Sequence, residues 1–248
     1  MTAAGASEEA PGRKRVGVLI SGRGSNMEAL VRAAAAPDYP AEIVCVISNR
    51  PDAAGLRTAQ AAGIATNALD HKAFATRPAF EEALTHALQD HGVELIALAG
   101  FMRLMTPAFV QRWHDQIINI HPSLLPAFKG LHVHQRMLDA GVMLAGCTVH
   151  VVRAAMDTGP IIAQGAVPVE AGDDAATLAA RVLKVEHQLY PHALALYASG
   201  ALRVEGDQIV WPQGADKVGD AATLDAATML IAPPLPASPL EQRAQSAI

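Results

Sequence analysis

An apolar run passes into a glycine-rich turn and then into a helical pattern in the segment VGVLISGRGSNMEAL, residues 16–30. Five apolar residues before such a turn are typical of a buried strand, and Pro37 would end the helix that follows. Further strand patterns follow at 43–48 and 95–99, and further helical patterns at 52–62 and 77–90. This alternation predicts parallel strands joined by right-handed crossovers.

The second half of the chain departs from that alternation. A strand at 117–120 is followed by a loop with two prolines, and no helical pattern separates the strand-like segments 147–153 and 161–169. Antiparallel pairing is expected there, before a long Ala- and Leu-rich helix at 175–199. We therefore predict an α/β fold with a doubly wound, mostly parallel mixed sheet and helices on both faces.

The two ends of the chain differ in composition from its middle. Residues 1–14 lack an apolar pattern, and residues 213–248 include the stretch APPLPASP. Such composition is typical of flexible or extended tails. We expect one domain at 15–212, flanked by a flexible tail at 1–14 and a Pro- and Ala-rich tail at 213–248.

Composition excludes several classes of protein. Hydrophobic residues make up 51% of the 248 residues and charged residues 17%, which does not suit a disordered chain. The net charge of −5 argues against a general nucleic-acid binder. No apolar run approaches the roughly 20 residues that span a bilayer, and the first residues lack the apolar core of a secretory signal. We expect a cytoplasmic protein with both cysteines reduced.

The loop from Ser21 to Asn26 has the properties of a phosphate site. Gly22 and Gly24 let the backbone approach a ligand, and the next helix would offer unpaired N–H groups and a positive dipole end. No Lys follows as in a P-loop, and Met27 stands where a dinucleotide fingerprint needs its third glycine. A phosphate monoester is favoured over NAD, although an ordinary strand–helix turn would use the same residues.

Asn119 and His121 close the strand that begins at Ile117 and, being two apart, lie on one side of it. An amide can donate to a developing oxyanion, and a histidine can move a proton or stabilise negative charge. Asp157, in the turn MDTGP, would favour the charged imidazole if it lay beside His121. The alternative is that these residues serve only the loops and turns they stand in.

Seven segments resemble the folate-dependent formyltransferase family, and within it the phosphoribosylglycinamide formyltransferases (glycinamide ribonucleotide transformylases). They are VLISGRGSNMEAL, ISNRPDAAGL, LAGFMRLMTPAFV, INIHPSLLPAFKGLH, GCTVHVV, MDTGPIIAQ and VEHQLYP. The resemblance extends from about Val16 to Leu202. It implies a formyltransferase-like fold and transfer of a formyl group from 10-formyltetrahydrofolate to the amine of glycinamide ribonucleotide, in de novo purine (IMP) biosynthesis.

The resemblance also implies roles for single residues. The catalytic residues would be Asn119, His121 and Asp157. The phosphorylated substrate would be held by Gly24, Ser25, Asn26 and Glu186. The folate would contact Arg77, Met102, Arg103, Leu104, Met105, Asn119, Arg153, Ala154, Ala155, Met156 and Asp157. No metal is expected, because His132 and His134 are too sparse a pair to indicate one.

Three alternatives remain open. Formyltetrahydrofolate hydrolase is similar but usually has an N-terminal regulatory domain, and another folate-dependent formyltransferase, which acts on methionyl-tRNA, has an additional C-terminal domain. Neither domain is indicated in this sequence. A non-catalytic phosphate-ligand-binding protein would use the glycine loop but leave Asn119, His121 and Asp157 without a shared purpose. The expected partners are small-molecule substrates, with no nucleic acid or membrane, and the chain is expected to be a monomer or homodimer.

Overall fold

The computed structural model describes residues 12–210, 222–223 and 230–232. The strands are β1 (Lys14–Ile20), β2 (Ala41–Ser48), β3 (Ala65–Ala68), β4 (Leu95–Leu98), β5 (Ile117–His121), β6 (Leu144–Val151), β7 (Ile161–Pro168), β8 (Arg203–Glu205), β9 (Gln208–Val210), β10 (Ala222–Thr223) and β11 (Leu230–Ala232). The helices are α1 (Ser25–Ala34), α2 (Ala54–Ala61), α3 (Arg77–Asp90), α4 (Pro107–Arg112), α5 (Val133–Asp139) and α6 (Ala175–Ala198), with a 3-10 turn at His71–Ala73.

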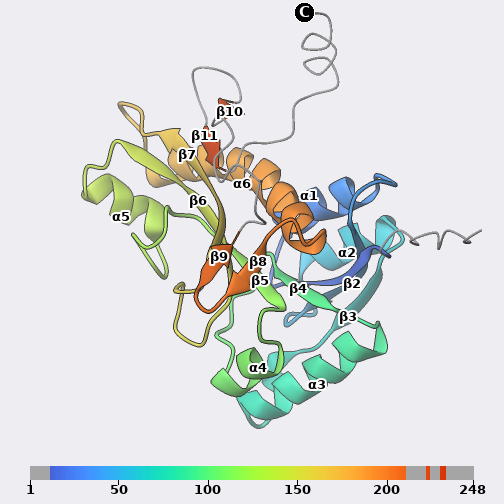
Figure 1. Ribbon diagram of the computed structural model, residues 1–248. Helices are drawn as coiled ribbons and strands as arrows, with labels where there is room; N and C mark the ends of the chain where they lie inside the picture. Colours follow the sequence, from blue (N-terminus) through green and yellow to red (C-terminus); the bar gives the residue numbers. More distant parts are fainter. Residues whose placement is uncertain (1–11, 211–221, 224–229, 233–248) are drawn as a thin grey trace, which may run out of the picture.

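Nine strands form one sheet in the order β10-β11-β7-β6-β5-β4-β1-β2-β3, and β8 pairs with β9 in a separate hairpin (Figure 1). The pairs β3–β2, β2–β1, β1–β4 and β4–β5 are parallel, whereas β5–β6, β6–β7, β7–β11 and β11–β10 are antiparallel. The predicted α/β fold, with a doubly wound mixed sheet and helices on both faces, is confirmed. The parallel pairs are formed by β1 to β5, which lie in the first half of the chain.

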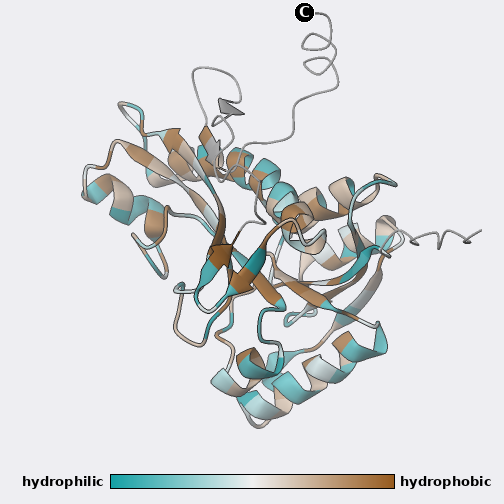
Figure 2. Ribbon diagram, viewed as in Figure 1, coloured by the Kyte–Doolittle hydropathy of each residue, from teal (hydrophilic) through white to brown (hydrophobic). Residues whose placement is uncertain are grey.

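The strands bury different side chains on their two faces. Val18 and Ile20 of β1 belong to an apolar core beneath α1, α2, α5 and α6, whereas Leu19 belongs to a second core. In that second core, Phe80 of α3 and Phe109 of α4 cover the opposite face. Figure 2 shows the central strands mostly brown and α3 carrying much teal, in keeping with buried strands and a half-exposed helix.

Helices α3, α4 and α6 begin where polar side chains bond their free N–H groups. Thr76 accepts from Ala79 N at 3.2 Å before α3, and Thr106 accepts from Phe109 N at 3.2 Å before α4. Asp174 and Thr177 form a capping box at the start of α6. Among the described residues, no helix is both long and apolar enough to cross a membrane.

The winding of the sheet reverses between β1 and β4. The chain runs outward from β1 to β2 and β3, then returns through α3 to β4 on the other side of β1. Loops that leave the carboxyl ends of two such strands diverge, and open α/β sheets bind ligands in the crevice between them. The loops after β1, β4 and β5 are therefore the ones placed to form a site.

The structure describes parts of both predicted tails, and the rest of each tail lies outside the described residues. β1 begins at Lys14, the last residue of the predicted N-terminal tail, and the Arg13 guanidinium just before it bonds the carbonyls of Ala34 and Ala41. Within the predicted tail at 213–248, β10 and β11 add two strands to the sheet, with β11 paired to β7. The edge strand β3 was not predicted, because its sequence ATNA has no apolar run.

Candidate active site

Three polar side chains share one face of β5 and β6. Asn119 pairs directly with His150 across the two strands, and His121 pairs with Thr148. Since positions two apart share a face, Asn119, His121 and His150 all point to the same side. This side is the one opposite α6, because Ile118, Ile120 and Val151 fill the core beneath that helix.

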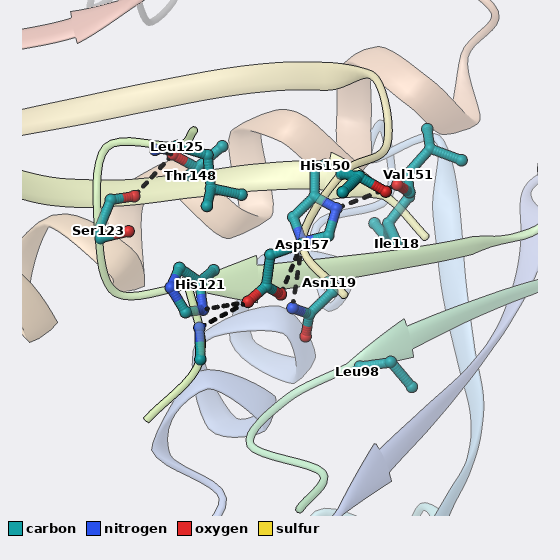
Figure 3. Close-up of polar contacts among 12 residues, drawn as sticks. Leu98, Ile118, Asn119, His121, Ser123, Leu125, Thr148, His150, Val151 and Asp157 are labelled. Carbon is teal, nitrogen blue, oxygen red and sulfur yellow. Dashed lines mark hydrogen bonds and ion pairs between the residues drawn. The ribbon is translucent and has the colours of Figure 1, made fainter. Parts of the chain in front are cut away.

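Asp157 reaches this face from the loop between β6 and β7. Its Oδ2 lies 3.5 Å from His121 Nδ1 and accepts a hydrogen bond from Gly130 N at 3.0 Å, while its Oδ1 lies 3.8 Å from His150 Nε2 (Figure 3). The residue has a φ of 51°, in the left-handed region that non-glycine residues seldom adopt. The structure thus brings together the three residues Asn119, His121 and Asp157, 38 positions apart at most by their numbering.

Both ring nitrogens of His121 face hydrogen-bond acceptors. Nε2 lies 3.0 Å from the carbonyl oxygen of Phe128, on the side away from Asp157, and the residue is 6% exposed. A carbonyl can only accept, so Nε2 carries a proton, and a second proton on Nδ1 would point at the Asp157 carboxylate. The surroundings therefore suit a doubly protonated, positively charged ring.

The loop that supplies the Phe128 carbonyl is held by buried polar groups. Thr148 donates to Ser123 O at 2.7 Å and accepts from Leu125 N at 3.0 Å. Gln164 of β7 donates to Leu125 O at 2.9 Å. With its backbone groups bonded in this way, the loop after β5 gives His121 a fixed partner.

His150 was missed by the sequence analysis, and it contacts two of the three predicted catalytic residues. Its Nδ1 lies 3.0 Å from the carbonyl of Val151, so this nitrogen carries the proton and Nε2 is left as an acceptor. Asn119 Nδ2 lies 3.3 Å from that Nε2 and donates to it. Burial lowers the pKa of His150, which favours the neutral ring that this bond requires.

The glycine loop leads into α1 as predicted. Gly24 caps the helix with a φ of 79°, and a Cβ there would lie 3.1 Å from the end of Met27 and 3.3 Å from the backbone of Gly55. Another residue at this position would be strained and crowded. The loop also leaves α1 without a side-chain cap, so its first N–H groups remain available to an anion.

Asn26 and Glu186, predicted separately to hold the substrate, contact each other. Asn26 Nδ2 donates to Glu186 Oε2 at 2.6 Å, which ties α1 to α6. Both residues are buried, and burial raises the pKa of Glu186. Asn26 Oδ1 is buried without a hydrogen-bond partner in the described part of the chain. An unsatisfied acceptor beside a buried carboxyl fits a site completed by a ligand with donors, such as an amine.

The loop after β4 lies beside the glycine loop, at the reversal of the winding. Ser21, the last residue before Gly22, accepts from Met102 N at 2.8 Å and donates to Asn49 Oδ1 at 2.5 Å. One buried hydroxyl therefore joins the two loops.

The residues predicted to contact folate differ in exposure. Met102 and Leu104 are 70% and 57% exposed, as apolar side chains free to cover a ligand would be. Arg103 lies over the ring of Phe80, 5.2 Å from its centre, and Met105 packs on the second core. Four more of these residues are exposed: Arg77 at the start of α3, and Ala154, Ala155 and Met156 in the loop before Asp157.

Among the residues predicted to contact folate, Arg153 forms ion pairs with other side chains of the protein. Its Nη1 lies 2.8 Å from Asp115 Oδ1, and its Nε lies 3.2 Å from Asp207 Oδ1. Its guanidinium is thus engaged by two carboxylates of the protein. The folate contact that the resemblance implies for Arg153 remains a prediction.

The described residues contain no group of three or more His, Cys, Asp or Glu side chains placed to hold a metal ion. His132 is exposed at the start of α5, and burial lowers the pKa of its neighbour His134. The prediction that no metal takes part remains a prediction.

Comparison with known proteins gives a consistent result. A family model described as formyl transferase matches residues 14–194. The chain is 41% identical over 197 residues to the phosphoribosylglycinamide formyltransferase of Escherichia coli K12, covering 79% of this chain and 92% of that protein. It resembles the crystal structure of phosphoribosylglycinamide formyltransferase from Brucella melitensis with 57% identity and a TM-score of 0.73, covering 78% of this chain and 98% of that one.

Longer proteins also match. The chain is 50% identical over 198 residues to the trifunctional purine biosynthetic protein adenosine-3 of Gallus gallus, covering 79% of this chain. It spans 20% of the length of that relative, so it corresponds to one part of the longer protein.

Proposed function

This chain belongs to the formyl transferase family, and from that premise we infer that it transfers the formyl group of 10-formyltetrahydrofolate to the amine of glycinamide ribonucleotide, in de novo purine biosynthesis. The observation that carries this proposal is the meeting of Asn119, His121 and Asp157 on one face of the sheet. They lie at the end where the glycine loop and the exposed loop after β4 also meet. A simple binding protein would have no use for that cluster.

The reaction moves one carbon between two nitrogens. The amine attacks the formyl carbon, the bond from that carbon to the folate nitrogen breaks, and the proton lost by the amine ends on the folate nitrogen. Negative charge develops on the formyl oxygen in between. Groups that donate hydrogen bonds to this oxygen, or place positive charge beside it, lower the barrier.

Asn119 and His121 have the properties that this step needs. One N–H of the Asn119 amide is bonded to His150, which leaves the second to donate to the formyl oxygen. A protonated His121 between Asp157 and the Phe128 carbonyl would hold a positive charge on the same face. Asp157 would maintain that charge and accept protons during the transfer.

The phosphate of glycinamide ribonucleotide would lie on the first N–H groups of α1, at Gly24, Ser25 and Asn26. Glu186 would meet the glycinamide part of this substrate. The folate would lie against Arg103 and its exposed neighbours and under the loop before Asp157. Holding both substrates side by side would supply much of the acceleration.

The test is an assay with the purified full chain, glycinamide ribonucleotide and 10-formyltetrahydrofolate. We expect formylated product and tetrahydrofolate in equal amounts, and no turnover when glycinamide ribonucleotide is left out. Release of formate without that substrate would instead identify a formyltetrahydrofolate hydrolase. Binding of both ligands without turnover would identify a non-catalytic protein.

Replacing Asn26 by Ala should weaken glycinamide ribonucleotide binding and spare folate binding. A hydrogen bond to a charged group contributes about 1.5–3 kcal/mol, so the KM for glycinamide ribonucleotide should rise by about 10- to 100-fold. The KM for folate should change by less than about twofold, since Asn26 lies on the α6 side of the site. Steady-state kinetics with each substrate varied in turn would measure both values.

The matched control is Asn67→Ala, in the edge strand β3. It should leave both KM values unchanged. An equal rise in both KM values for Asn26→Ala would mean that the fold was damaged, and an unchanged KM for glycinamide ribonucleotide would mean that the Asn26 side chain does not contact this substrate.

The remaining features of the proposal rest on the sequence. We propose a cytoplasmic enzyme that works without a metal or nucleic acid, away from membranes, as a monomer or homodimer. A net charge of −5 does not favour binding of a polyanion such as nucleic acid, whereas a small anionic ligand needs only a few local positive groups.

A further inference from the structure

The loop between β6 and β7 carries Asp157 and is fastened mainly at its two ends. Val152 N donates to Ile117 O at 2.8 Å at one end, and Val151 N donates to Pro160 O at 2.9 Å at the other. Between these ends Ala154, Ala155 and Met156 are exposed. The position of Asp157 therefore depends on how firmly the ends of the loop are held.

Arg153 is the charged side chain at the first of these ends. Besides its ion pairs with Asp115 and Asp207, its Nη2 donates to Gly206 O at 3.2 Å. Its side chain is only 14% exposed, although Asp207 is 84% exposed. The guanidinium thus fastens the loop to the turn before β5 and to the turn of the β8–β9 hairpin.

The two attachment points differ in how they are held. Tyr197 of α6 donates from its hydroxyl to Asp115 O at 2.7 Å, which holds the turn before β5. The β8–β9 hairpin follows α6 and lies in front of β5, next to the loop that carries Asp157 (Figure 1). Arg153 therefore joins three segments that are separated by 38 and 54 residues along the chain.

We propose that Arg153 is a positioning residue, which uses the β8–β9 hairpin and Asp115 to hold Asp157 against His121. This assignment rests on the proposed function, and it gives the Arg153 side chain a role other than the folate contact that the resemblance implied. The gap of 3.5 Å between Asp157 and His121 leaves little room for loop movement. A displacement of about 1 Å in a catalytic group can cost about a hundredfold in rate.

A guanidinium suits this task better than an ammonium. Its planar set of donors can bond two carboxylates and a carbonyl at once, whereas a lysine offers one flexible charge. Arg153→Lys should therefore keep some of the contacts with Asp115, Asp207 and Gly206, and Arg153→Ala should lose all of them.

The experiment compares Arg153→Ala, Arg153→Lys and Asp207→Asn with the unchanged full chain. For Arg153→Ala we expect kcat to fall about tenfold, with the KM for glycinamide ribonucleotide unchanged within about twofold. Arg153→Lys should be intermediate, and Asp207→Asn should lose about twofold because that carboxylate is exposed. Hydrogen exchange of the amides at 154–158 should speed up in the same order.

Arg203→Ala is the matched control, because Arg203 pairs with Glu205 in the same hairpin and is 65% exposed. It should leave kcat and the exchange rates unchanged. A higher KM for folate with full kcat in Arg153→Ala, and no effect of Asp207→Asn, would restore the folate contact and overturn the proposal. A lower melting temperature with unchanged kcat and exchange would also overturn it, since Arg153 would then be merely structural.

The exchange measurement keeps this proposal separate from the proposed function. If the unchanged chain transferred no formyl group, the proposed function would fail, while faster exchange at 154–158 in Arg153→Ala would still show that Arg153 anchors the loop. Unchanged exchange in that variant would reject the anchor whether or not the chain is active.

Discussion

Asp157→Asn should lower kcat for formyl transfer by about a thousandfold. The substitution keeps the shape of the side chain, and its amide can still accept from Gly130 N. It removes the negative charge 3.5 Å from His121 Nδ1, so a positive charge that develops on that ring in the transition state would lose its counter-charge. Loss of one transition-state donor costs about 10²–10³ in kcat, and loss of acid–base function costs about 10²–10⁴.

The KM values should change by less than about fivefold, because the charge acts on the transition state more than on bound substrates. Asp139→Asn, on the exposed side of α5, is the control and should keep full activity. His121→Ala should lose a similar factor, and the double variant should lose little more, because the two side chains act as one unit. Near-normal kcat in folded Asp157→Asn would refute the proposed mechanism.

The parts of this site that the sequence predicts well are the ones that depend on short spacing. Asn119 and His121 are two apart in a strand, so their common side follows from the pleat alone. The glycine loop follows from its place between a buried strand and a helix. In both cases the neighbouring residues along the chain already determine the geometry.

His150 could not be found in that way, because its partners come from another strand. It stands in an apolar stretch, CTVHVV, where nothing marks it as catalytic. Its place opposite Asn119 depends on the register of two antiparallel strands, and a shift of one residue would turn it to the other face. The sequence predicts antiparallel pairing here but no register, so it does not predict which face of the sheet His150 occupies.

Arg153 shows a different limit. The resemblance implied a folate contact for Arg153 as one member of the loop at 153–157. Which carboxylates reach it depends on the hairpin after α6 and on the turn before β5, and both lie far away in sequence. Contacts of this kind are decided by tertiary packing, for which local pattern holds no signal.

A second large effect is expected at His150, because this residue fixes the orientation of the Asn119 amide. His150→Phe should lower kcat by about a hundredfold, since the Phe ring fills the space but cannot accept from Asn119 Nδ2, and the amide would be free to turn. His150→Gln offers an acceptor oxygen and should lose only about tenfold. The exposed His86→Phe is the control and should lose nothing.

The pH dependence of unfolding distinguishes a His150 that accepts a hydrogen bond from Asn119 from a His150 that only fills space. Burial lowers the pKa of His150 below its usual 6.5, with Asp157 opposing the shift and His121 and Lys129 adding to it. A group with a lowered pKa in the folded state contributes stability that is present above pH 6.5 and is lost as the pH falls through the folded value. Protonation at Nε2 would also turn that atom from an acceptor into a donor facing another donor.

Both kcat and thermal stability of the unchanged chain should therefore fall on the acid side of pH 6.5 in a way that His150→Gln does not share. Rate profiles and thermal unfolding between neutral and mildly acid pH would measure this difference. The half-buried His134 and His187 also have a lowered pKa and are present in both proteins, so their contribution cancels in the comparison. The proposed role of His150 would be refuted if kcat and thermal stability fell equally in both proteins at acid pH and if His150→Phe kept a normal kcat. Asn119 would then be oriented by other contacts.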